Sequence, residues 1–172
     1  MEKLENAVKA GNDGLSLEFD LPREAYWEYA CRAGTVGTFS DRNTIVPPGT
    51  TEVALKPTLG LIAWYLSNNN TVDGPHTGVK EVGLRKANPA GLYDVHGNVY
   101  ELCLDAWDLS TTLMGGNNPL STSGSYRAVR GGSYSTVASP CRSAYRDYDT
   151  PMPTNTNIGF RLCTVGGGNV VP

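Results

Sequence analysis

The chain has 172 residues, 40% of them hydrophobic and 18% charged, with a formal net charge of −3. This length suffices for one domain with a buried core, and the acidic balance argues against general nucleic-acid binding, which requires a basic surface. No run of about 18 apolar residues is present, so we expect no membrane span. The 20 glycines and 11 prolines predict a turn-rich fold with much irregular backbone.

Two helices are predicted near the start of the chain. A short one covers Lys3–Ala10, in a stretch without the apolar core of a signal peptide. In the second, Asp20 offers a capping carboxylate, Pro22 suits the first turn, Glu24 complements the positive helix end, and Gly34 ends the helix. Side chains at helical spacing form its predicted apolar face: Ala25, Tyr26, Tyr29, Ala30 and Ala33.

Residues 35–88 lack a regular pattern. Turn-forming clusters interrupt this stretch at Pro47–Gly49, Asn68–Asn70 and Asp73–Pro75, and its only apolar run is Leu61–Tyr65. We therefore predict long loops with one or two short strands.

The rest of the chain predicts a small sheet. A tight turn at Asn88–Gly91 leads into a strand ending at Leu102, and a polar loop covers Thr111–Gly124. Three further short strands follow, at Arg127–Tyr134 with a break at its glycine pair, at Cys141–Arg146 and at Ile158–Cys163. Residues 166–172 are expected to fray as a tail.

The four cysteines are widely spaced along the chain. Cys31, Cys103, Cys141 and Cys163 are separated by 72, 38 and 22 positions, so no C-x-x-C pair can clamp zinc or run a redox cycle. Two disulfides or four thiols both fit this spacing. We favour thiols, because a chain of this length does not need disulfides for stability.

Four segments stand in a characteristic order: Leu21–Gly34, Gly91–Glu101, Arg130–Ser133 and Gly159–Arg161. This succession resembles the formylglycine-generating enzyme, or sulfatase-modifying factor, family over residues 20–163. The resemblance implies an α+β domain of the C-type-lectin-like fold, single over residues 1–172, with little regular secondary structure. The usual N-terminal half of the family is mostly absent from this sequence.

The resemblance also bears on catalysis. Formylglycine-generating enzymes hold copper with a cysteine pair shortly after the glycine pair, and soft thiolates suit Cu(I). Here Ser133–Pro140 contains no cysteine, and Cys141 aligns better with a later structural position. The related iron-dependent sulfoxide synthases need three histidines, whereas this chain has only His76 and His96. We therefore predict that the chain is not an enzyme.

A third branch of the family fits better. The variable proteins of diversity-generating retroelements use this fold, with a hypervariable end that corresponds to residues 130–161. Diversification acts on adenines, mainly in asparagine codons, and gives Tyr, Ser, Thr, Asp, Ala, Val, Pro or Asn but not Lys, Glu, Gln, Met or Trp. Between Ser133 and Ile158 there is no Lys, Glu, Gln or Trp, and Met152 would be a templated residue. The absence of Lys and Glu from this segment is limited support for diversification, because both residues are absent from the whole sequence after Glu101.

The resemblance thus implies a ligand-binding variable protein whose partner is a protein or another cell-surface ligand, and not a nucleic acid. Tyrosines among small polar residues are typical of such binding surfaces. The predicted contact residues are Tyr134, Ser135, Thr136, Val137, Ser139, Tyr145, Asp147, Tyr148, Asp149, Thr154, Asn155 and Thr156. Three alternatives stay open: an ordinary polar loop region, a copper-dependent oxidase of cysteine peptides, and a structural accessory domain that buries this face against another chain.

Asp94, Gly97, Val99 and Glu101 match positions that hold a structural Ca²⁺ in formylglycine-generating enzymes. Two carboxylates and two backbone carbonyls are suitable calcium ligands. The ion would brace the scaffold and need not contact the ligand. In the alternative, Asp94 caps the turn and Glu101 pairs with an arginine. His96, within the same turn, is expected to bond the backbone.

The family frame assigns structural roles to the remaining conspicuous side chains. Four arginines are expected to tie loops together through carbonyls and carboxylates: Arg130, Arg142, Arg146 and Arg161. The tryptophans are expected in the core: Trp27, Trp64 and Trp107. Cys31 and Cys163 belong to the first and last segments, which the fold brings together, so they are the expected pair if a disulfide forms.

Overall fold

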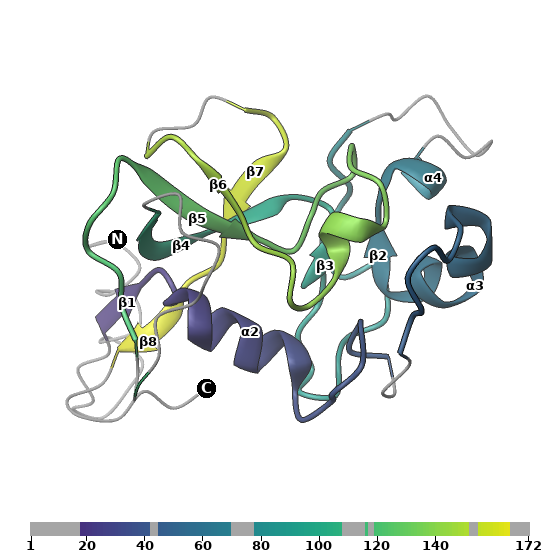
Figure 1. Cartoon of the computed structure of the whole chain (residues 1–172), viewed down its shortest axis with the longest axis horizontal. Helices are drawn as coiled ribbons and strands as arrows, with labels where there is room; N and C mark the ends of the chain where they lie inside the picture. The colour runs from purple at the N-terminus through teal and green to yellow at the C-terminus, as the bar shows by residue number, and fades with distance from the viewer. Residues whose placement is uncertain are drawn as a thin grey trace.

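A computed structural model describes residues 18–41, 45–69, 78–107, 116, 119–151 and 155–165. In Figure 1 a four-stranded sheet with helix α2 beside it lies on one side, and α3, α4 and the short strands β2 and β3 lie on the other. Long irregular segments connect these elements. This is the α+β architecture with little regular secondary structure that the sequence predicts. The helix predicted at residues 3–10 and the tail at 166–172 lie outside the described residues.

Helix α2 (Glu24–Arg32) is capped from a distant part of the chain. The backbone N–H of Glu24 donates to the Asp105 carboxylate at 2.6 Å, so a side chain from strand β4 (Tyr100–Trp107) caps the first turn. The prediction of Asp20 as the cap is wrong, because Asp20 lies in strand β1 (Glu18–Asp20) and accepts from the N–H of Leu21 at 2.7 Å.

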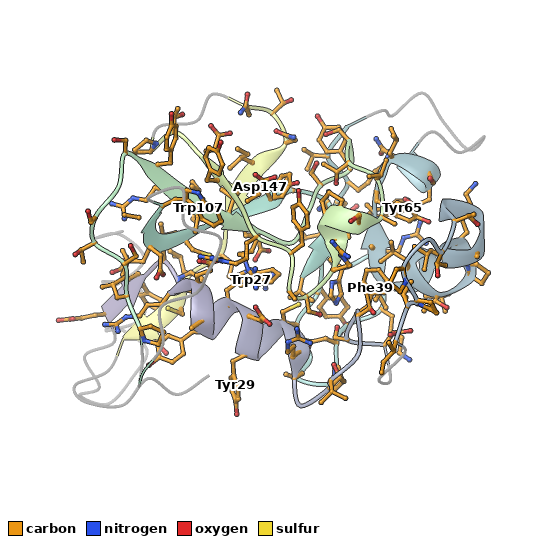
Figure 2. All side chains as sticks on the ribbon, viewed as in Figure 1. Trp27, Tyr29, Phe39, Tyr65, Trp107 and Asp147 are labelled. Atoms are coloured by element: carbon orange, nitrogen blue, oxygen red, sulfur yellow. The ribbon has the colours of Figure 1, made fainter. Side chains whose placement is uncertain are left out.

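The buried face of α2 contains a charged residue. Glu24, Trp27 and Cys31 are buried, whereas Tyr29 is 64% exposed. Figure 2 shows Trp27 at the centre of the molecule and Tyr29 directed away from it. The predicted apolar face is therefore wrong at Tyr29. The buried face of the helix includes Glu24 instead, because Arg130 and Arg146 pair with its carboxylate.

The four-stranded sheet has the order β6 (Asp147–Asp149), β5 (Tyr126–Arg130), β4 and β7 (Ile158–Phe160). Strand β5 is antiparallel to β4 and β6, and β7 is parallel to β4. Two small pairings complete the structure: β1 with β8 (Cys163–Val165), antiparallel, and β2 (Ala63–Trp64) with β3 (His96–Gly97), parallel. The sheet thus brings residues 126–130, 147–149 and 158–160 into one layer.

The strand predicted at Cys141–Arg146 is wrong. A single 3₁₀ turn, η1 (Ser139–Cys141), and further turns occupy this stretch, and the strand begins at Asp147. The backbone groups here have other partners, because Arg130 donates to the carbonyls of Ser143 and Tyr145, and the N–H of Ser143 donates to Thr38. They are not available to pair with a strand.

Residues 35–88 contain two helices that the sequence did not predict. Helix α3 (Glu52–Ile62) starts at Thr51, whose side chain accepts from the N–H of Ala54, and α4 (Leu66–Asn69) follows β2. Pro57 and Gly60 lie inside α3. Both residues have low helix propensity, so the local sequence does not predict this helix.

Two apolar clusters form the core. One gathers around Phe39, Leu59 and Tyr65, and the other around Trp27, Cys103 and Trp107. The core prediction is thus confirmed for Trp27 and Trp107, while Trp64 is half-buried under the guanidinium of Arg85, 3.5 Å from its ring centroid. All four cysteines lie in the described ranges, and none is in a disulfide. Among the described helices, none is long and apolar enough to cross a membrane.

Candidate ligand-binding surface

The loop after β5 is set by its glycine pair. Gly131 and Gly132 have φ of 93° and 71°, and a Cβ on Gly132 would lie 2.7 Å from the Cys141 sulfur. Only glycine suits this combination of conformation and close approach. The N–H of Tyr134 then donates to the carbonyl of Asn98 at 2.8 Å. The loop beginning at Ser133 is thereby anchored through its backbone.

A polar seam joins this loop to two other segments. The Tyr134 and Thr156 hydroxyls lie 3.1 Å apart, and Asn157 donates to the Ser135 hydroxyl at 3.3 Å. Asn155 donates to the carboxylate of Asp149, at the end of β6, at 2.6 Å. Thus the loop after β5, strand β6 and the loop before β7 meet along one band of side chains.

On β6 an aromatic group lies on the opposite face of the strand from Asp147 and Asp149, because successive side chains of a strand point to opposite faces. Tyr148 is 42% exposed and stacks on Trp107, with centroids 5.4 Å apart, and it contacts Tyr126 at 5.0 Å. The sequence did not identify Trp107 and Tyr126 as support for Tyr148. No local signal could have done so, because the contact depends on the pairing of Tyr148 with Ala128 across β5 and β6.

We call the side chains of these three segments the tyrosine band. Its members are Tyr134, Ser135, Thr136, Asp147, Tyr148, Asp149, Asn155 and Thr156. Asp147 is half-buried and accepts from the Tyr100 hydroxyl at 3.2 Å. Burial and this carboxylate raise the pKa of Tyr100, so it stays protonated and donates. Asp147 therefore supports the band from inside.

The remaining predicted contact residues are not bonded into the band. Val137 is 46% exposed, and Ser139 is exposed at the start of η1. Tyr145 is half-buried and lines a groove with Arg142 and Arg146. Thr154 lies outside the described residues.

Buried and half-buried ion pairs hold the segments beneath the band, as predicted for Arg130, Arg146 and Arg161, whereas Arg142 is exposed and, within the described residues, bonds only to the nearby Ser139 carbonyl. The Arg130 side chain is fully buried and contacts the carboxylates of Glu24 and Glu28 as well as two carbonyls. Arg146 donates to both oxygens of Glu24 at 2.6 Å, and this bond holds the pKa of Arg146 above its usual value. A bidentate pair of this kind fixes both position and orientation. Arg161 pairs with Glu101 in the same way, at 2.8 and 2.5 Å.

The predicted calcium ligands are differently engaged. Asp94 is buried with φ of 57°; one oxygen accepts from the N–H of Gly83, and the other has no hydrogen-bond partner within the described ranges. Glu101 is occupied, because its carboxylate accepts from Arg161 and from the indole of Trp27. Asp94 thus has one oxygen without a hydrogen bond but already interacts with the charges of Arg85 and Arg161, and Glu101 would have to share its oxygens. Calcium at this turn stays a prediction.

The Gly97 and Val99 positions serve the turn itself. The N–H of Gly97 donates to Gly131, and a Cβ on Gly97 would lie 2.1 Å from the carbonyl oxygen of Trp64. Val99 packs beside Gly159. The turn is therefore wedged between β2 and the glycine pair.

His96 is a structural residue, as predicted. Its Nδ1 lies 2.8 Å from the Cys141 carbonyl, and its Nε2 accepts from the N–H of Ser40 at 3.1 Å. This arrangement assigns the neutral tautomer with the proton on Nδ1, and burial lowers the pKa of His96 to about 4. A histidine bonded on both sides and excluded from solvent is not a catalytic base.

Two cysteines share a small pocket. Cys31 and Cys163 line a space of about 220 Å³ between α2 and β8. Cys31 is fully buried, and burial raises its pKa to about 12, while burial also raises that of Cys163. Such thiols are protonated at neutral pH and are poor nucleophiles and metal ligands.

Comparison with known protein sequences finds related proteins. Residues 4–165 match the sulfatase-modifying factor enzyme 1-like domain. The formylglycine-generating enzyme of Mus musculus is 34% identical over 146 residues, which cover 82% of this chain and 38% of that protein. The enzyme of Streptomyces coelicolor is 32% identical over 151 residues, 82% of this chain and 45% of that protein. The chain thus spans less than half the length of these relatives.

Two solved structures share the fold. Variable protein 1 of Treponema denticola superimposes with a TM-score of 0.66 and 35% identity, covering 87% of this chain and 49% of that one. PvdO from Pseudomonas aeruginosa gives a TM-score of 0.64 at 23% identity, covering 94% and 58%. The second likeness concerns the fold alone.

Proposed function

We propose that the chain, which belongs to the sulfatase-modifying factor enzyme 1-like domain family, is a variable ligand-binding protein. A retroelement would diversify residues 130–161, and the tyrosine band would contact protein or cell-surface ligands. The observation that carries the proposal is the tyrosine band itself, in which side chains of three segments are bonded to one another around Tyr134, while Tyr148 is exposed on the other face of β6. The likeness to a solved variable protein at 35% identity supports it.

The proposal is also supported by the fact that the residues that hold the loops in place differ from the residues that are exposed on them. The loops on either side of β6 are held in place without the exposed side chains. The groups that hold them are the Gly131–Gly132 backbone, the buried Arg130 and the Arg146–Glu24 pair. Ser135 and Thr156 are exposed, and their side-chain bonds join them to other members of the region. Substitutions at exposed positions of this kind usually change stability by less than about 0.5 kcal/mol. The surface can therefore vary while the fold is kept.

We propose further that the chain does not catalyse the oxidation that formylglycine-generating enzymes perform. The segment Ser133–Pro140 lacks the cysteine pair, and the high pKa of Cys31 disfavours a thiolate at the pocket it shares with Cys163. The copper-oxidase alternative requires that these two sulfurs bind Cu(I). Competition of the reduced protein with a Cu(I) chelator such as bathocuproine disulfonate checks this, and we expect the chelator to keep the metal.

The binding proposal is tested with a phage-displayed library of random 12-residue peptides selected on the wild-type protein. Tyr134→Ala and Tyr148→Ala should each weaken the selected binders about tenfold, because buried tyrosines at interfaces contribute on the order of 1–2 kcal/mol. Tyr29→Ala is the matched control, since Tyr29 is exposed on α2 and does not belong to the band. Binders that tolerate both band variants would refute the proposal.

A further inference from the structure

A groove of about 610 Å³ lies beside the tyrosine band, between the last turn of α2 and the segment leading into β6. Its walls carry three guanidinium groups, two aromatic rings and aliphatic side chains. The residues that matter here are Arg32, Val36, Trp107, Arg142, Tyr145 and Arg146. Ile45 also lines it, and Ile45 and Val36 are 74% and 76% exposed. The groove is therefore both basic and apolar.

Most of the positive charge at the groove is already paired. Arg32 donates to Glu28 at 2.8 Å, and Arg146 donates to Glu24. Arg130 lies behind them and contacts the same two carboxylates. These three arginines thus share two glutamates.

A third carboxylate, that of Asp105, acts on Arg146 from within the core. It is buried, and its oxygens accept the backbone N–H groups of Glu24 and Ser121 at 2.6 and 3.1 Å. A fourth carboxylate, that of Asp147, acts on Tyr145 in the groove wall, so four carboxylates and four arginines surround the groove. The charges balance in number, and what distinguishes Arg142 from the other three arginines is the absence of an ion pair to it within the described residues.

Arg142 presents its charge at the surface. Its side chain is exposed, its Nε donates to the carbonyl of Ser139 at 2.9 Å, and its guanidinium lies 5.8 Å from the ring centroid of Tyr145. No ion pair to Arg142 is formed by the described part of the chain. The bond to Ser139 uses only Nε and leaves the two terminal nitrogens, whose fork geometry matches a carboxylate.

We infer that this groove is a subsite for an acidic peptide segment of the ligand, with Arg142 holding an aspartate or glutamate side chain. The inference rests on the proposed binding function, because Arg142 and Tyr145 lie in the segment proposed to vary. Apolar side chains that flank the acid would pack on Val36 and Ile45, and the aromatic and arginine lining is typical of binding hot spots. The aliphatic wall favours a peptide over an anionic sugar, which would need polar partners there.

The test uses the same random 12-residue peptide library, selected separately on the wild type, Arg142→Gln and Lys56→Gln. Lys56→Gln is the matched control, because it also removes one exposed positive charge, but from α3. Binders of the wild type and of Lys56→Gln should be enriched in aspartate and glutamate, and binders of Arg142→Gln should not. For a synthetic peptide of the most enriched sequence, Kd should rise about tenfold with Arg142→Gln or with asparagine at the acidic position, because a hydrogen bond to a charged group is worth about that factor. Combining both changes should add little more.

The outcomes separate this inference from the proposed function. Binders that depend on Tyr148 but show no acidic enrichment and no loss with Arg142→Gln overturn the groove and leave the tyrosine band. Binders that need Arg142 but tolerate Tyr134→Ala and Tyr148→Ala support the groove and overturn the band. Displacement of the acidic peptide by 3′-sialyllactose at a lower concentration than by the free peptide would assign the groove to an anionic sugar and overturn the peptide assignment.

Discussion

At the scale of single residues, His96 joins the two apolar clusters of the core. Its ring packs edge-on against Phe39 with centroids 5.7 Å apart, and its Nε2 lies 3.8 Å from the sulfur of Cys31 in the other cluster. Both ring nitrogens have partners, so the buried neutral ring is satisfied, and a protonated ring would have to lose the bond from Ser40. The fold is therefore sensitive to the charge of this residue.

This sensitivity predicts how stability depends on pH. The pKa of His96 is about 4 in the folded protein and about 6.5 in the unfolded chain. Between these two pH values the unfolded chain binds a proton at His96 and the folded protein does not. The contribution of neutral His96 to the free energy of unfolding is therefore fully present above pH 6.5. As the pH falls from 6.5 to 4, the free energy of unfolding decreases by about 3 kcal/mol. Urea denaturation at pH 7 and pH 4 measures it. His96→Asn should be less stable at pH 7 but should lose about 3 kcal/mol less than the wild type on acidification. Equal losses would show that His96 does not cause the dependence.

At the scale of elements, α2 is fastened to the sheet side by charge as well as by Trp27. Glu24 is 1% exposed and is shared by Arg146 and Arg130. A buried carboxylate costs desolvation energy, which is offset here because both of its oxygens accept hydrogen bonds. The pair also fixes the path of residues 142–146, from which β6 and Tyr148 continue.

We therefore expect Glu24→Gln to lower the free energy of unfolding by about 3 kcal/mol, since it removes the bidentate partner of Arg146 and leaves the buried Arg130 with Glu28 alone. Arg32→Gln breaks the more exposed i,i+4 pair with Glu28 and should cost less than about 1 kcal/mol. Urea denaturation of both variants gives the comparison. A cost for Glu24→Gln no larger than that for Arg32→Gln would contradict the structural role of the buried pair.

Sequence reasoning predicted some elements and not others for physical reasons. Helix α2 and the turn into β4 were predictable, because local spacing and turn residues determine them. Helix α3 was not, since Pro57 and Gly60 oppose it locally and tertiary packing of Leu59 and Ile62 stabilises it. The strand at β6 was misplaced by a few residues, because Arg130 removes the pairing capacity of residues 143–145 from a distance.

The same distinction applies to the candidate site. The positions of Tyr134 and Tyr148 between the Arg130 and Arg161 segments could be read from the order of the motifs. How their two segments lie relative to each other depends on the register of β5 with β6 and on bonds between residues 22 positions apart, as between Tyr134 and Thr156. The basic groove was not predictable either, because α2 and the β6 segment contribute to it together.

At the scale of the whole molecule, a calcium ion would brace the turn between β3 and β4 and so stabilise the entire fold. The resemblance predicts a higher Tm in 1 mM CaCl₂ than in EDTA, because an ion that binds only the folded state stabilises it by mass action. Asp94→Asn should reduce this difference, since it removes the charge of the carboxylate with an open oxygen. Identical Tm values in calcium and EDTA would contradict the calcium site. The role of Glu101 would then be its bonds with Arg161 and Trp27.

The whole chain combines a scaffold of buried arginine, glutamate and glycine residues with an exposed surface that need not take part in folding. If that surface is diversified, the variation must be written in the DNA that encodes it. Sequencing the locus tests this most directly. Diversification predicts a near-identical downstream copy of the coding region for Arg130–Arg161, differing only at adenines and adjacent to a reverse transcriptase gene. A locus with neither a second copy nor a reverse transcriptase gene would contradict diversification and leave a fixed binding surface.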